Sequence, residues 1–162
     1  MAGFDSGHFC KPKGMRNRLS FLFFIISIFV LLPGCSTQPQ PINYGIDECV
    51  HCKMKITEQK FGAEIITKKG KALKFDSGEC MINYTKENSA AHETFDKYLV
   101  IDYAHSSQLI DATTATWLSG EAINSPMGGN IAAFDTKESA LKNNSEISGQ
   151  VLTWDEVIKL DL

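Results

Sequence analysis

Positive charge is scarce in this sequence once the N-terminal leader is set aside, and no basic stripe runs along the chain. The chain has 16 basic and 19 acidic residues, which gives a net charge of −3. The first 34 residues hold four of the basic residues and one of the acidic ones, so the remainder carries −6. An acidic domain without a basic patch is poorly suited to binding phosphates. We therefore expect no nucleic-acid partner.

Signatures of common enzymes are also missing. The sequence shows no Ser-His-Asp order, no glycine-rich phosphate loop and no paired carboxylates of the kind used in acid–base catalysis. It has no second Cys or His pair at the spacing of a structural zinc knuckle. These absences favour a binding protein over an enzyme.

No apolar run reaches the length of about 20 residues that a transmembrane helix needs. The longest one, Leu19–Leu32, comes after two arginines and is followed by Pro33-Gly34-Cys35. A charged start, a short apolar run and small residues at its end are typical of a secretory signal peptide. The end also resembles a lipobox, the signal of bacterial lipoproteins in which the cysteine is lipidated and becomes the mature N-terminus. We predict a signal peptide over 1–34 and a lipid on Cys35.

This leader sets the expected boundaries of the protein. Met15 begins a compact charged segment ahead of the apolar run, so we interpret it as the native start. Residues 35–47 are polar and carry prolines, which is typical of a semi-extended tether behind a lipidated N-terminus. A single small domain over 48–162 would follow. The protein is expected on the periplasmic side of a bacterial membrane, held there by its lipid anchor.

The densest cluster of metal-binding chemistry is Cys49-Val50-His51-Cys52-Lys53-Met54. Soft sulfur ligands together with imidazole suit a soft, closed-shell ion, and Cu(I) fits best. The Cys-x-x-Cys core alone also serves zinc sites, redox disulfides and structural bridges. Met54 favours copper, because zinc sites use Cys, His and carboxylate and rarely a thioether.

Spacing places two of these sulfurs on one side of the chain. In an extended segment successive side chains alternate, so Cys52 and Met54 face the same way. Two residues span at most about 7 Å, which lets both sulfurs reach one ion. A third methionine, Met127, lies between Pro126 and Gly128-Gly129, a pattern that predicts a tight surface loop.

Cysteine pairing has two readings. Beyond the leader the chain has an odd number of cysteines, Cys49, Cys52 and Cys80. Exported proteins keep disulfides, so a Cys49–Cys52 bridge stays open, and with it a thiol–disulfide oxidoreductase as the alternative function. Redox motifs of this type normally open a helix directly after a strand, whereas this one precedes every recognisable strand.

The hydrophobic pattern predicts an alternation of short strands and helices. Strands are expected over 63–67, 72–75, 98–103, 107–111, 131–136 and 149–153. Helices or helical turns are expected over 78–87, 137–143 and 154–158. Residues 88–93 are expected to form a polar loop, and 112–118 fits either a short helix or a strand.

Turn and cap residues mark the ends of these elements. Gly70 lies at the tip of the hairpin turn that joins the first two strands. Asp76-Ser77 offers an N-cap to the helix that follows, and we interpret Asp76 and Asp135 as caps rather than as acids or bases. Thr153 is expected to cap the closing turn.

The second half of the domain repeats the first in outline. In both halves a strand ends in Phe-Asp-[Ser/Thr] and a helix begins, at Phe75 and again at Phe134. Two β-β-α-β units in one small domain indicate an α+β fold with a mostly antiparallel sheet and helices on it.

Several stretches together carry a family resemblance. They are Cys49-x-x-Cys52-x-Met54, Phe75-Asp76-x-x-x-Cys80-Met81, Asp102-Tyr103, the region of Asp111-Ala112 and Trp117, Ser125-Pro126-Met127-Gly128, and Ala133-Phe134-Asp135. In this order they resemble the NosL family, copper-binding lipoproteins that assist maturation of nitrous-oxide reductase. The resemblance covers nearly the whole predicted domain and includes the lipoprotein leader.

The resemblance implies a two-unit fold akin to that of organomercurial lyase. It implies Cu(I) binding by a membrane-anchored metallochaperone, and delivery to nitrous-oxide reductase through a NosDFY-type transporter complex. By this match Cys52 and Met54 correspond to the sulfur pair and Met127 to the distant thioether. Cys49 takes the first motif position, whereas His51 and Cys80 are candidates from their chemistry. A lyase-like enzyme is a rival by fold analogy alone, and no residue is marked as the acid that would protonate carbon.

Overall fold

The computed structural model describes residues 37–162. The predicted signal peptide and the predicted lipidation site Cys35 lie outside the described residues. Among the helices of the described part, none is long and apolar enough to cross a membrane.

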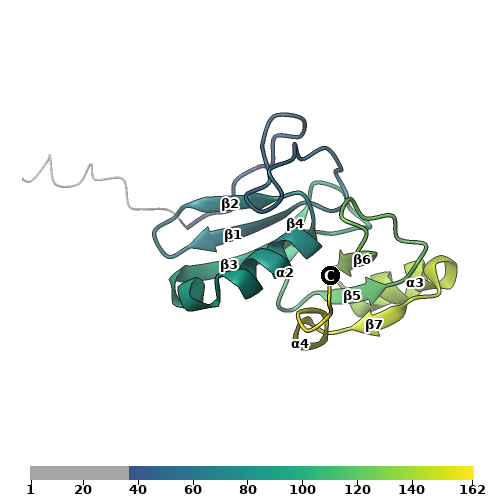
Figure 1. Cartoon of the computed structure of the whole chain (residues 1–162). Coiled ribbons are helices and arrows are strands. Elements are labelled where there is room, and N and C mark those ends of the chain that lie inside the picture. The colour runs from purple at the N-terminus through teal and green to yellow at the C-terminus, as the bar shows by residue number, and fades with distance from the viewer. Residues whose placement is uncertain (1–36) are drawn as a thin grey trace, which may run out of the picture. The chain divides into compact units, whose positions relative to one another are not determined.

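The first half of the domain forms a four-stranded sheet in the order β2-β1-β3-β4. Its strands are β1 (Ala63–Thr67), β2 (Ala72–Phe75), β3 (Phe95–Ile101) and β4 (Leu109–Asp111), and every pairing is antiparallel. The β1–β2 turn contains Gly70 at φ 78°, a left-handed conformation that glycine adopts without strain. Figure 1 shows this sheet with helix α2 (Gly78–Glu87) lying along it.

The second half forms a three-stranded sheet in the order β6-β5-β7, again antiparallel throughout. Its strands are β5 (Thr116–Ser119), β6 (Ile131–Phe134) and β7 (Gln150–Leu152). Helix α3 (Lys137–Ile147) connects β6 to β7, and the short helix α4 (Trp154–Val157) follows. A capping box between Thr153 and Glu156 starts α4, as the sequence predicted.

The predicted repeat is confirmed by the order of the strands. In each half the second strand, the first strand and the strand after the helix lie side by side, as β2-β1-β3 and as β6-β5-β7. The register also repeats, because Phe75 pairs with the first residue of β1 and Phe134 with the first residue of β5. The fold is therefore α+β, with two β-β-α-β units and two antiparallel sheets.

Two local predictions needed correction, and one stretch that was left open is now assigned. Asp76 and Asp135 do not cap the helices: the caps are Ser77 and Thr136, whose hydroxyls accept from the backbone N–H groups three residues on. Residues 89–94 form a 3-10 helix, η1 (Ser89–Thr94), where a polar loop was expected. The undecided stretch resolves into a turn followed by strand β5.

The two units share the larger of two core clusters, whereas the smaller one contains Phe134 and Leu118 of the second unit. Phe75, from the first unit, and Trp117, from the second, belong to the same buried cluster. A Cβ on Gly78 would stand 2.9 Å from the Trp117 ring, so the start of α2 needs glycine to lie this close. This contact fixes the N-terminus of α2, and with it Cys80, against the second unit.

Candidate metal centre

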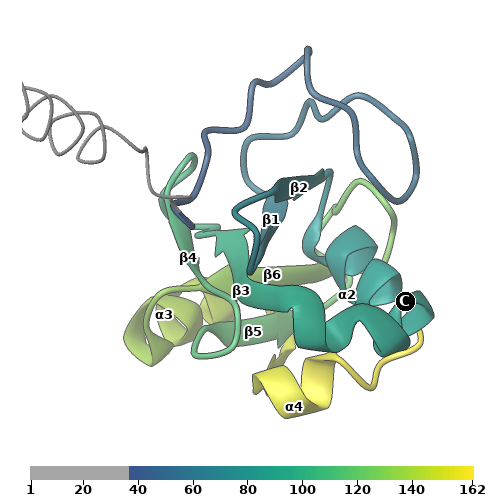
Figure 2. The same cartoon turned by 90° about the vertical axis from the view of Figure 1, so that its left-hand side faces the viewer.

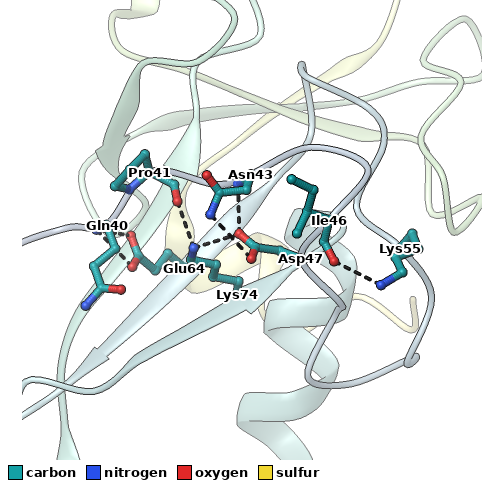
Figure 3. A network of polar contacts seen from close by, with 8 residues as sticks. All are labelled: Gln40, Pro41, Asn43, Ile46, Asp47, Lys55, Glu64 and Lys74. Carbon is teal, nitrogen blue, oxygen red and sulfur yellow. Dashed lines mark hydrogen bonds and ion pairs between the residues drawn. The ribbon is translucent and has the colours of Figure 1, made fainter.

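Residues 41–56, called here the N-terminal loop, are fastened to the first sheet by polar contacts (Figure 3). The Lys74 ammonium forms an ion pair with Asp47 at 2.7 Å and donates to the Pro41 carbonyl at 2.7 Å. Burial raises the pKa of Asp47, but the Lys74 ammonium and hydrogen bonds from Asn43 outweigh it and hold that pKa below its usual value. These contacts attach the start of the loop to strand β2. Figure 2 shows the loop rising from β2 and β1, clear of the second sheet.

The contacts with the sheet begin ahead of the predicted domain boundary. The buried Glu64 carboxylate accepts from the Gln40 backbone N–H at 3.1 and 3.2 Å. Lys97 donates to the Thr37 carbonyl at 3.1 Å. Part of the stretch expected to act as a tether thus lies on the sheet.

The Cys-x-x-Cys-x-Met stretch folds into a tight turn at the end of this loop. It is not the extended segment on which the expected alternation of Cys52 and Met54 was based. The Cys49 N–H donates to the Met54 carbonyl at 2.8 Å, and the Lys53 N–H donates to the Cys49 carbonyl at 3.0 Å. Lys53 adopts a left-handed conformation at φ 64°, which lets the chain reverse within so few residues. The Val50 N–H donates to the Lys74 carbonyl at 2.9 Å, so the turn is bound to the edge of β2.

Helix α2 supplies a third cysteine to this turn. Cys80 lies in the first turn of the helix, where its N–H donates to the Ser77 hydroxyl at 3.4 Å. The sulfur atoms of Cys49, Cys52 and Cys80 all lie within 4.8 Å of one another, and we call these residues the thiol triad. Cys49 and Cys80 are each 1% exposed, whereas Cys52 is half-buried. All three are free, so the Cys49–Cys52 disulfide that the sequence left open is not formed.

The three thiols of the triad differ in pKa. The pKa of Cys49 is lowered to about 4, chiefly by a hydrogen bond from the Cys80 thiol. Burial opposes this effect, and the backbone N–H groups of Asp76 and Cys52 support it. The same interaction with Cys49 raises the pKa of Cys80, and burial raises that of Cys52. Cys49 is therefore the thiolate of the group, and the thiolate is the form that binds metals. Three soft sulfur donors in one largely buried cluster suit a soft ion such as Cu(I).

The two methionines predicted as ligands stand at the surface. Met54 is 49% exposed and Met127 is 42% exposed, which is unusual for large apolar side chains. The Met127 loop is held by two hydrogen bonds of Ser125, from the Gly128 N–H to its carbonyl and from the Asn130 N–H to its hydroxyl.

The Met127 loop lies against the N-terminus of α2. A Cβ on Gly129 would stand 2.5 Å from the Glu79 side chain, which shows how closely the loop approaches the residue next to Cys80. The fold thus brings the loop of the distant thioether to the helix that carries the third thiol, a proximity that the sequence alone does not reveal.

His51 stands apart from the sulfur atoms. Its Nε2 lies 3.2 Å from the Glu87 carboxylate, at the C-terminal end of α2. Its Nδ1 is buried and has no partner. The imidazole is not part of the triad. Because Nε2 is paired with Glu87, Nδ1 is the ring nitrogen that remains to bind an ion.

The sequence did not predict that two carboxylates near the triad would be buried. Asp76 and Glu79 are 3% and 1% exposed, and Asp76 Oδ1 and both Glu79 oxygens lack hydrogen-bond partners. Burial raises the pKa of Asp76 to about 6, and the nearby Cys49 thiolate raises it as well. The one sequence signal for their burial is their position next to the Ser77 cap, where the buried first turn of α2 begins.

The comparisons agree with this architecture. The profile of the NosL family matches residues 43–161. The crystal structure of the copper chaperone NosL from Shewanella denitrificans is similar, with a TM-score of 0.65 and 25% sequence identity. That match covers 75% of this chain and 96% of the other. No protein of curated function matches the chain. Since the family profile spans most of the described residues, from the N-terminal loop to the last turn, the chain belongs to the NosL family.

Proposed function

We propose that this protein is a membrane-anchored Cu(I) metallochaperone that delivers copper for assembly of the copper centres of nitrous-oxide reductase. One observation carries the proposal: three free thiols lie within 4.8 Å of one another in a chain of the NosL family. An exposed methionine, Met54, follows two residues after Cys52. The similar chaperone from Shewanella denitrificans supports copper as the cargo.

The proposed ligands of the transferable ion are Cys52, Met54 and Met127. Cys52 is the accessible member of the triad, and the two thioethers stand at the surface, where a partner can reach them. Cys49 or, through Nδ1, His51 acts as an auxiliary ligand; the burial of both atoms argues against a role as the entry ligand. Thioethers do not form disulfides, so such a site survives in an oxidising compartment where thiols alone would pair.

Delivery requires partners and a location. We propose that a NosDFY-type transporter complex and nitrous-oxide reductase receive the copper, and that a lipid on Cys35 holds the protein at the periplasmic side of a bacterial membrane. Family membership supports the partners, and the lipobox-like sequence supports the anchor. Cys35→Ala should move the protein from the membrane fraction to the soluble fraction while Cu(I) binding persists. Continued sedimentation of Cys35→Ala with membranes would contradict the anchor.

The alternative function, thiol–disulfide exchange, needs an attacking thiolate that a substrate can reach. Cys49 is the thiolate here, but it is 1% exposed, and the more accessible Cys52 has its pKa raised by burial. The acidic thiol and the accessible thiol are therefore different residues. This arrangement suits metal binding better than redox exchange.

The test is a Cu(I) competition titration on the full chain, purified in detergent without oxygen. One Cu(I) equivalent should bind in competition with a chromophoric chelator, and Cys52→Ser should weaken binding more than about tenfold because a thiolate ligand is lost. Met81→Leu, at a buried neighbour that offers no ligand to this set, is the matched control and should bind as wild type. A wild-type chain that cannot compete with the chelator would overturn the proposal, and turnover in an insulin-reduction assay would favour the alternative.

A further inference from the structure

Cys80 has no place in the ligand set of a surface copper site, although its sulfur is within 4.8 Å of both Cys49 and Cys52. We propose that the protein holds Cu(I) at two positions that share Cys52. The inner position is formed by the thiolates of Cys49, Cys52 and Cys80, and the outer position is the set of Cys52, Met54 and Met127. The inference rests on the proposed Cu(I) cargo and adds where the ion is kept before transfer.

The inner position has the size of a three-coordinate thiolate site. An ion at the centre of a triangle with sides of 4.8 Å lies about 2.8 Å from each sulfur, and smaller sides bring it closer. Metal–thiolate bonds measure about 2.3 Å, so small side-chain movements close the site. The backbone around it is already fixed, by the Cys49 and Lys53 hydrogen bonds of the turn and by the Ser77 cap of α2.

Exposure rises in steps from the inner position to the outer one. Cys49 and Cys80 are sealed from solvent at 1% each. Cys52 is half-buried, and the thioethers of Met54 and Met127 are 49% and 42% exposed. A partner protein can therefore reach the outer ligands but not the inner ones. An ion held by the triad is protected, whereas an ion held by the thioethers is open to attack.

Transfer between the two positions requires only ligand exchange. The copper–Cys52 bond is kept, bonds to Cys49 and Cys80 break, and bonds to Met54 and Met127 form. Copper remains Cu(I) throughout, so no oxidant or reductant takes part. Any proton that a thiol loses when the inner position fills is regained when that position empties. Cys52 lies between Cys49 and Met54 in the tight turn, and the proposal assigns its sulfur to both sets.

The two positions should respond differently to mutation. If the inner position holds the ion at equilibrium, Cys80→Ala lowers Cu(I) affinity by at least about tenfold and speeds release to a chelator. Met127→Leu keeps the side-chain volume but removes an outer thioether, so it should lower affinity less than Cys80→Ala does, because the inner set is intact. It should slow release, since the outer step loses a ligand. In the Cys80→Ala background, Met127→Leu should lower affinity clearly.

The measurements are Cu(I) competition titration, stopped-flow release to the chelator and X-ray absorption of the loaded full chain. Cys80→Ser provides a second replacement, and Met81→Leu controls for repacking of α2. Circular dichroism of each variant in the metal-free state checks folding. Wild type should show three sulfur neighbours at thiolate distance. Cys80→Ala should show fewer, because its ion moves to the outer set, in which Cys52 is the one thiolate. If both Cys80 variants fold and match wild type in affinity, release and sulfur count, the inner position is overturned while copper binding stands. If wild type binds no Cu(I), the proposed function itself fails.

Discussion

The two β-β-α-β units share a scaffold but not a chemistry. Aligned at Phe75 and Phe134, the helix caps Ser77 and Thr136 coincide, and Cys80 falls on the position of Ser139. The first turn of α2 is buried, whereas α3 buries a single residue, Ala140. The same strand–cap–helix device thus places a thiol in the interior of one unit and a hydroxyl near the surface of the other.

The difference arises from what lies against each unit. In the first unit the N-terminal loop binds the edge of β2 and brings Cys49 and Cys52 to the start of α2. The residue that corresponds to Lys74, which holds this loop, is Ala133 in the second unit. Duplication of a fold supplies a framework, and a site appears where an additional segment packs onto one copy.

The largest expected effect tests whether the buried residues of the two units contribute equally to stability. Phe75 and Phe134 are both fully buried at equivalent strand ends. Replacing either with alanine should lower the free energy of unfolding by about 3–5 kcal/mol, because each leaves a cavity in a dense interior. Urea denaturation of the two variants measures this. A large loss in one unit and a small loss in the other would show that the two halves contribute unequally to stability.

A smaller effect should separate the two helix starts. Gly78→Ala places a Cβ 2.9 Å from the Trp117 ring and should cost about 1–3 kcal/mol through overpacking. Lys137→Ala, at the equivalent position of α3, is exposed and should change stability by less than about 0.5 kcal/mol. Thermal melting of both variants gives the comparison. Equal shifts would mean that α2 does not pack more tightly than α3.

The smallest effect concerns the segment that only the first unit carries. Because its partners hold the pKa of Asp47 below the unfolded value, the carboxylate stabilises the folded state above the unfolded pKa, and this contribution is lost as pH falls through the folded pKa. Asp47→Asn should cost about 1 kcal/mol or less at pH 7, and the difference from wild type should shrink under acidic conditions. Urea midpoints measured from pH 7 downward test this. A difference that grows on acidification would contradict the assignment.

Elements with complete local signals could be predicted from sequence. The first hairpin and α2 have the predicted bounds, because a turn glycine between two short apolar runs and a serine cap specify them locally. Strand β5 stayed undecided because Trp117 and Leu118 are both buried, which removes the alternation that marks a strand. The 3-10 helix at 89–94 lacks a strong pattern of its own.

The candidate site was predictable only in part. Cys49, Cys52 and Met54 are neighbours in sequence, so their chemistry could be read directly. The convergence of Cys80 with them depends on the cap of α2, on the contact of Gly78 with Trp117 and on the loop bound to β2. Long-range packing of this kind leaves no mark in a single sequence.

The contacts of Thr37 and Gln40 with the first sheet also determine how far the protein can act from a membrane. If Cys35 carries the lipid, the chain from Cys35 to Thr37, whose carbonyl accepts from Lys97, spans at most about 7 Å. So short a connection would hold the domain beside the lipid headgroups of the membrane that carries the anchor. Encounters with a membrane-embedded transporter then become a two-dimensional search at high local concentration. A water-soluble acceptor would have to come to the membrane to collect its copper.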